Sequence, residues 1–154
     1  MCQTRTGLLP LGIVVLLLSA CGSGGKSANA VPTANAGVPQ TVTEGATVTL
    51  NVTVNQPGTG TPMNLTGFTA AMKIRSSWDA ATAALSLTTG GSGITLGGVL
   101  GTIQVVISAV QSAALGGTLS RPAAYVYDLE ITSAGGEVTK VLRGTCLILP
   151  EATR

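Results

Sequence analysis

Residues 46–54 read ATVTLNVTV, and this stretch decides the fold class. Valine and leucine occupy the even positions from Val48 to Val54, and threonine and asparagine occupy the odd positions between them. Because successive side chains of a strand point to opposite faces, this period of two predicts a strand with one buried and one solvated face. Residues 124–132, AYVYDLEIT, alternate in the same way. Their expected inward set is Tyr125, Tyr127, Leu129 and Ile131.

Further short apolar stretches lie between turns rich in glycine and serine. Strands are expected within residues 67–75, 83–89, 92–96, 101–108 and 137–150. Residues 108–115 have a brief helical pattern, and Gly144 is the position at which the last strand is expected to bulge. About seven strands at spacings of roughly 8–15 residues, with no long helix, predict an all-β fold: an immunoglobulin-like antiparallel β-sandwich.

The start of the chain has a different character. Arg5 precedes an apolar run over residues 8–18, which Pro10 and Gly12 interrupt. A run of about ten residues is too short to span a bilayer core, which needs about 20, and it fits the apolar region of a signal peptide. The run ends in Leu18-Ser19-Ala20-Cys21, which resembles the lipobox of bacterial lipoproteins. This resemblance implies cleavage before Cys21 and attachment of lipid, such as palmitate, to that residue.

Three segments are expected from these patterns. Residues 1–20 are a lipoprotein signal peptide, residues 21–37 a flexible tether rich in glycine, serine and alanine, and residues 38–154 the β-sandwich domain. Gly22 stands where the lipoprotein resemblance would place aspartate for retention in the inner membrane. The resemblance therefore implies an outer-membrane lipoprotein.

The composition argues against most catalytic chemistry. The chain has no histidine, which removes the usual general base and the commonest metal ligand. Charged residues make up 9% of the chain, and its few cations are scattered, so no nucleic-acid partner is expected. No catalytic, cofactor-binding or metal-binding residue is predicted. Once Cys2 has left with the signal and Cys21 carries lipid, Cys146 is the remaining thiol, and its apolar surroundings predict a buried, unreactive side chain.

Three side chains admit a functional as well as a structural interpretation. Asp128 and Glu130 share one face of a strand, an arrangement that can serve acid–base catalysis or calcium binding. No third acidic residue lies close by in the sequence, so we expect the solvated face of a sheet. Trp78 is expected at a core or edge position, with a contact surface as the alternative.

Two family resemblances extend this interpretation. Residues 34–51 resemble the opening strand of PKD-type immunoglobulin-like domains. A longer resemblance, to immunoglobulin-like structural proteins of phage tails and baseplates, rests on five pieces. They are Leu65-Thr66-Gly67-Phe68, Lys73-Ile74-Arg75, Tyr127-Asp128-Leu129-Glu130, the strand around Gly144, and Pro150-Glu151-Ala152-Thr153-Arg154. The phage resemblance implies assembly or attachment without catalysis.

Two functions are therefore expected. The first is a non-enzymatic envelope lipoprotein that carries a phage-derived β-sandwich as a binding or structural module, held at the membrane through acylated Cys21. The alternative is a virion component of a tail, baseplate or capsid surface. A virion part has no need of an export signal, which favours the first. In either case a protein partner or a second copy is expected to pair with a sheet edge.

Overall fold

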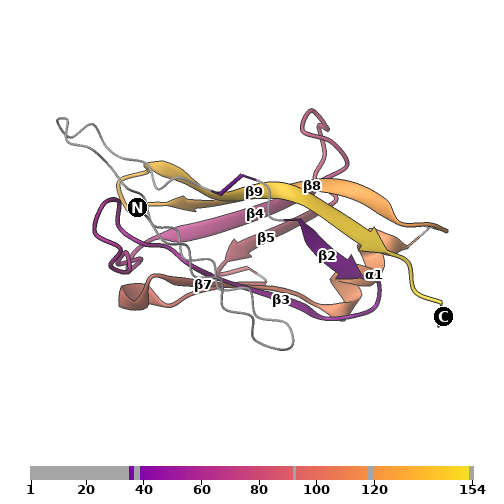
Figure 1. Ribbon diagram of the computed structural model, residues 1–154, viewed down its shortest axis with the longest axis horizontal. Helices are drawn as coiled ribbons and strands as arrows, with labels where there is room; N and C mark the ends of the chain where they lie inside the picture. Colours follow the sequence, from indigo (N-terminus) through magenta and orange to yellow (C-terminus); the bar gives the residue numbers. More distant parts are fainter. Residues whose placement is uncertain (1–34, 37–38, 92, 118–119, 153–154) are drawn as a thin grey trace, which may run out of the picture.

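The computed structural model of the chain describes residues 35–36, 39–91, 93–117 and 120–152. The predicted signal peptide, Cys21 and most of the predicted tether lie outside these residues. The described part folds into β-strands with one short 3₁₀ helix and one α-helix (Figure 1). Within it, neither helix has the length and apolar character needed to cross a bilayer.

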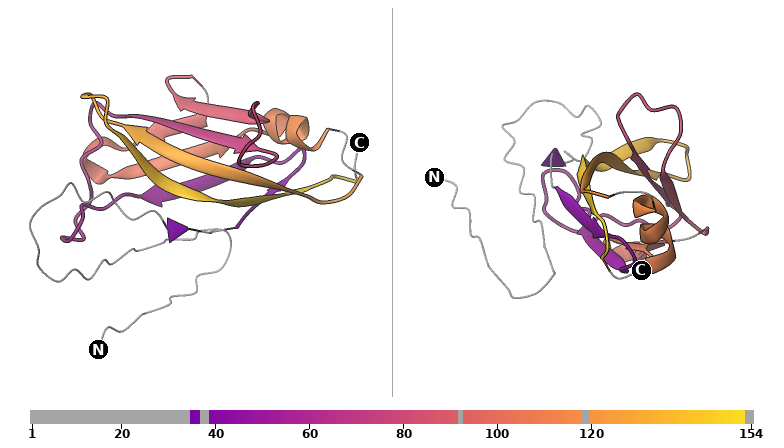
Figure 2. Two further views of the ribbon diagram at one scale, coloured as in Figure 1. Left: turned by 90° about the horizontal axis from the view of Figure 1, so that it is seen from above. Right: turned by 90° about the vertical axis from the view of Figure 1, so that its right-hand side faces the viewer.

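The strands form a single curved sheet. Its elements are β1 Asn35–Ala36, β2 Gln40–Thr43, β3 Val48–Thr53, β4 Thr69–Arg75, β5 Leu85–Thr89, β6 Gly93–Leu96, η1 Gly98–Leu100, β7 Thr102–Ile107, α1 Ala109–Gly116, β8 Ala123–Thr132 and β9 Val138–Leu149. Their order in the sheet is β1-β9-β8-β4-β5-β6-β7-β3, and β2 also pairs with β9. The sheet curls until β9, β8 and β4 face β7 and β3 across the core (Figure 2).

The predicted all-β class is confirmed, but the prediction that the pairing is purely antiparallel is wrong. Both β1 and β2 run parallel to β9, and β5 runs parallel to β6. The result is one mixed, nearly barrel-shaped sheet. Local alternation reports which side of a strand is buried, but it carries no information about the direction of a neighbour that is distant in sequence. β1 lies within residues 21–37, the range expected to be tether.

The core follows the predicted alternation. In β3, the side chains of Val48, Leu50 and Val52 are partly buried, and the residues between them are exposed. Tyr125 of β8 is partly buried, and the other inward residues of the central parts of β4, β7 and β8 are at most 4% exposed. They are Ala70, Met72, Ile74, Ile103, Val105, Ile107, Tyr127, Leu129 and Ile131. Both halves of the curled sheet therefore contribute to one hydrophobic core.

The irregularity in β9 lies three residues before the predicted position. Gly144 pairs regularly with Tyr127, whereas the register shifts between Leu129 and Glu130 of β8. Leu129 is opposite Leu142 and Glu130 is opposite Lys140, so Val141 is the extra residue. Val141 and Leu142 are both buried, as a bulge requires when two successive side chains turn to the same face. The predicted bulge at Gly144 is therefore wrong.

The helical pattern near residue 108 is confirmed as α1, which packs near the ends of β2 and β9 (Figure 1). Ser108 caps it: the Gln111 N–H donates to the Ser108 hydroxyl at 3.3 Å, and the Ser108 N–H donates to Gln111 Oε1 at 2.9 Å. The buried Ser112 hydroxyl donates to the Ala46 carbonyl at 2.7 Å. That bond ties α1 to the turn between β2 and β3.

Candidate interaction surface

The outer face of β4, β8 and β9 carries most of the charge in the described residues. Of the five lysine and arginine residues there, Arg121 is the one that lies elsewhere. Two carboxylates of β8 lie among the four cations, which leaves a net charge of +2. We call this set the charged face; it consists of Lys73, Arg75, Asp128, Glu130, Lys140 and Arg143.

Strand register places these charges beside one another. Asp128 lies between Lys73 of β4 and Arg143 of β9 in one row across the sheet. Lys140 contacts both acids: its Nζ donates to Asp128 Oδ2 at 2.8 Å and to Glu130 Oε1 at 2.7 Å. Hydrogen bonds to Asp128 and then to Glu130 raise the pKa of Lys140. Both acids of the charged face are therefore paired with Lys140.

The predicted solvated face for Asp128 and Glu130 is confirmed. Their side chains keep 27% and 35% of their surface exposed, and both engage Lys140. The described residues contain no group of three or more acidic, cysteine or histidine side chains that could hold a metal ion. As these carboxylates are arranged, they act as ion-pair partners on a sheet surface.

Trp78 lies at the border of the charged face, in the loop that joins β4 to β5. Trp78 is 53% exposed, so of the predicted core or edge position the core is wrong, and the exposure fits an edge position or the alternative, a contact surface. The Arg143 guanidinium lies 4.8 Å from the centre of the Trp78 ring, within the range of a cation–π interaction. An exposed tryptophan that stacks on arginine combines two of the three side chains that are enriched at binding hot spots.

The loop that carries Trp78 is held by several hydrogen bonds. The Ala84 N–H donates to the Ile74 carbonyl at 2.8 Å, and Arg75 Nη1 donates to the Ala80 carbonyl. A hydrogen bond from Ser77 lowers the pKa of Asp79, which favours its charged form. Trp78 is thus presented on an anchored loop, which reduces the conformational entropy that binding would cost.

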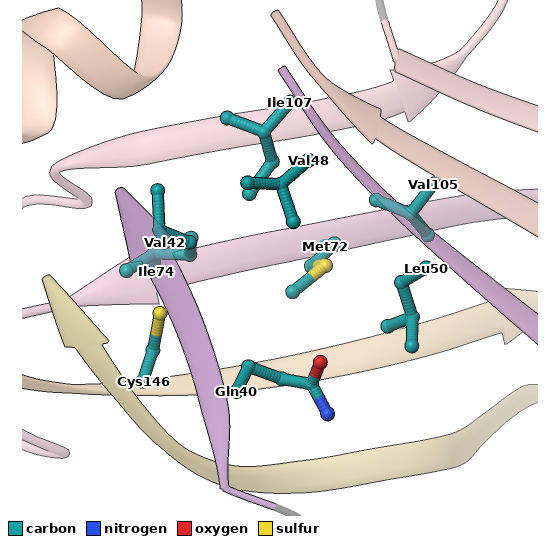
Figure 3. A pocket seen from close by; sticks show the side chains of 9 residues that line it. All are labelled: Gln40, Val42, Val48, Leu50, Met72, Ile74, Val105, Ile107 and Cys146. Atoms are coloured by element: carbon teal, nitrogen blue, oxygen red, sulfur yellow. The ribbon is translucent and has the colours of Figure 1, made fainter. Parts of the chain in front are cut away.

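A cavity in the described part of the core is too small for a small-molecule ligand. This cavity of about 20 Å³ lies among β2, β3, β4, β7 and β9, and Gln40 is the one polar side chain among the nine that line it (Figure 3). That volume holds about one water molecule, whereas ligand pockets occupy roughly 300–1,000 Å³. The cavity is therefore a packing gap near the two edges of the sheet.

Cys146 borders this cavity, and its predicted burial is confirmed. The side chain is 1% exposed, and burial raises the pKa of its thiol to about 11. Because the thiolate is the reactive form, this thiol stays protonated and unreactive at neutral pH.

Burial also raises the pKa of the Tyr127 phenol, and a hydrogen bond with the Gln40 side chain partly opposes that rise.

A partner strand was expected at a sheet edge, and the edges of this sheet are β3 on one side and β1 and β2 on the other.

The predicted lipidation site, Cys21, lies outside the described residues. Sequence reasoning singled out Asp128, Glu130 and Trp78, but it missed their connection through Lys140 and Arg143. Those contacts depend on the pairing of β8 with β9 and on the position of the 76–84 loop, which the alternation pattern does not report.

No protein-family model matches this sequence, and no curated protein matches it either. Among solved structures, the fold is weakly similar to the N-terminal domain of phage TP901-1 ORF48. The two share 12% sequence identity with a TM-score of 0.36, and the match covers 75% of this chain and 84% of that one.

Proposed function

We propose that the chain is a lipoprotein of the cell envelope, anchored through acylated Cys21, whose β-domain is a binding or structural module without catalytic activity. The observation that carries the anchor is the sequence Leu18-Ser19-Ala20-Cys21 at the end of an apolar run. Several acyl chains on one cysteine would hold a domain firmly, since a single chain gives only marginal membrane binding.

The charged face with Trp78 supports the role of the domain as a module. Trp78 exposes half of its side chain on an anchored loop, and Arg143 is already aligned with its ring. Such a rigid aromatic and guanidinium pair can bury area against a partner at low entropic cost. The core consists of apolar side chains together with Tyr127 and the unreactive Cys146.

The strand order supports an immunoglobulin-like arrangement as the finer description of the fold. In constant-type immunoglobulin domains, one layer contains strands B, E and D and the other contains C, F and G. Here β3, β7 and β6 are neighbours in the order of strands B, E and D. Strands β4, β8 and β9 are neighbours in the order of strands C, F and G. On this interpretation the parallel strand β2 extends the second layer beyond β9, and the short pairing of β5 with β6 joins the layers.

The alternative function is a structural protein of a phage particle. It is favoured by the phage-like sequence pieces, most of which fall on one part of the fold. Residues 73–75 lie in β4, residues 127–130 in β8, and Gly144 in β9, while residues 65–68 form the turn that enters β4. These pieces therefore fall on the part of the sheet that also carries the charged face.

Fractionation of cells that express the wild-type chain or Cys21→Ala tests the anchor. Labelled palmitate should enter the wild-type chain, which should sediment with membranes, and it should not enter the variant. Equal labelling of both chains, or of neither, would refute the anchor. Mass spectrometry of purified phage particles tests the alternative, which requires the chain in virions with residues 1–20 intact.

A further inference from the structure

The two edges of the sheet differ in how they are protected. Exposed edge strands can pair with other chains, and proteins usually blunt them with short strands, proline, charges or bulges. The β9 side is covered by two short strands, β1 and β2, and Pro39 directly precedes β2. At the other end β3 runs for six residues, VTLNVT, with no proline and no charge.

The hydrogen bonds of β3 show which of its peptide groups have no strand partner among the described residues. The Val54 N–H donates to the Gly101 carbonyl at 2.8 Å, continuing the register in which Val52 faces Ile103. Because peptide groups alternate in direction along a strand, the even-numbered residues of β3 bond β7 and the odd-numbered residues point away. The outward N–H and C=O groups therefore belong to Thr49, Asn51 and Thr53.

These three residues are symmetric about Asn51, and we propose that β3 pairs antiparallel with β3 of a second copy of this chain, with Asn51 opposite Asn51. In this register Thr49 of each copy lies opposite Thr53 of the other. All three outward residues then fall in hydrogen-bonded pairs, and the alternation keeps Leu50 and Val52 on the core side of the joined sheet.

The surroundings of β3 suit a second copy of the same chain. A two-fold axis brings identical side chains together, so any charge near it would repel itself. The exposed side chains of β3 and β7 are threonine, asparagine and glutamine, and Gln104 Nε2 donates to Asn51 Oδ1 at 3.2 Å. The charged face lies on the other layer. The inference rests on the proposed function in one respect. Anchoring at a membrane raises the local concentration of the chain, which favours pairing through a weak edge contact.

Cysteine cross-linking in membranes from cells that express the full chain tests the register. Opposed residues of a hydrogen-bonded antiparallel pair have Cα atoms about 5.5 Å apart, which suits a disulfide. With diamide as the oxidant, Asn51→Cys should form a covalent dimer. Gln104→Cys, on the same outer face but one strand inward, is the matched control and should remain monomeric.

The register has a stricter test in two differently tagged chains, one with Thr49→Cys and the other with Thr53→Cys. Co-expressed, they should form a mixed dimer, while Thr49→Cys alone should not. In the mixed pair, an added Asn51→Lys places like charges at the axis and should reduce the dimer by about threefold or more. Added Gln104→Lys should change it little.

Three outcomes would overturn the inference: equal cross-linking at positions 51 and 104, self-linking of Thr49→Cys, or linkage of position 51 to a different protein. Labelled palmitate in the same samples separates this inference from the proposed function. Label without cross-linking refutes the pairing and leaves the anchor intact. Cross-linking without label refutes the anchor and supports the pairing.

Discussion

The layer of β4, β8 and β9 and the layer of β3 and β7 bury the same kind of side chain but present different surfaces. Leu129 in the first and Ile103 in the second are both fully buried in one core. On the outside, the first layer carries the charged face and Trp78. The second carries uncharged polar residues and ends in β3, an edge that no other described strand covers. Inward residues therefore make the fold, and outward residues make the two layers suitable for different contacts.

The largest expected effect tests whether the layers share one core. Leu129→Ala and Ile103→Ala should each lower the free energy of unfolding by about 3 kcal/mol, because each removes buried methyl groups and leaves a cavity. Leu147→Ala, on the outer side of β9 with 41% of its side chain exposed, should cost less than about 1 kcal/mol. Urea denaturation measures all three, and a small loss for Ile103→Ala beside a large loss for Leu129→Ala would show two independent layers.

The next effect concerns pH and the Cys146 thiol. Burial holds its proton in the folded state, so its stability contribution is complete below the unfolded pKa of 9.0 and is lost as the pH rises toward about 11. Cys146→Ala should remove this part of the alkaline decline in melting temperature. A decline of the same size in the variant would show that the thiol is not its source.

A smaller effect is expected at Trp78. Arg143→Ala should cost less than about 1 kcal/mol of stability, since cation–π interactions at exposed sites contribute about 0.5–1 kcal/mol. It should nevertheless change the emission of Trp78, the one tryptophan in the chain. Arg121→Ala is the matched control, since Arg121 is exposed and lies off the charged face. Identical spectra for the two variants would contradict the stacking.

The smallest effect is expected at Lys140. Its side chain is 50% exposed, and such surface ion pairs contribute about 1 kcal/mol or less. Lys140→Met should therefore change the melting temperature only slightly at neutral pH. Because hydrogen bonds to the acids raise the pKa of Lys140 above 10.5, its contribution is present below that pH and is lost above it. Salt should diminish the effect of this variant, and salt-independent destabilisation would argue against an ionic origin.

Local pattern predicted the seven strands from β3 to β9 and the inward faces of β3, β4 and β8, because burial imposes a period of two on a strand. It did not predict the short strands β1 and β2. It also predicted α1, whose start is marked by the Ser108 and Gln111 capping pair. The parallel pairing of β2 with β9 joins residues about a hundred positions apart, and no local signal encodes it. The observed bulge is at Val141 and the predicted one was at Gly144, for a related reason. Glycine indicates where a strand can bend, whereas the register with β8 decides where β9 does bend.

The candidate surface was predictable in its parts but not as a whole. Asp128 and Glu130 share a face through simple alternation, so their exposure could be read from the sequence. Trp78 could not be placed, because its position depends on a loop that returns across the sheet to Arg143. The free peptide groups of β3 follow from alternation as well, but only once β7 is known to be its one partner among the described strands.

The intact mass of the protein purified from membranes tests the central claim most directly. A lipid-anchored module predicts the mass of residues 21–154 plus acyl chains on the first residue. A chain that retains residues 1–20, or that begins at Cys21 without lipid, would contradict the account.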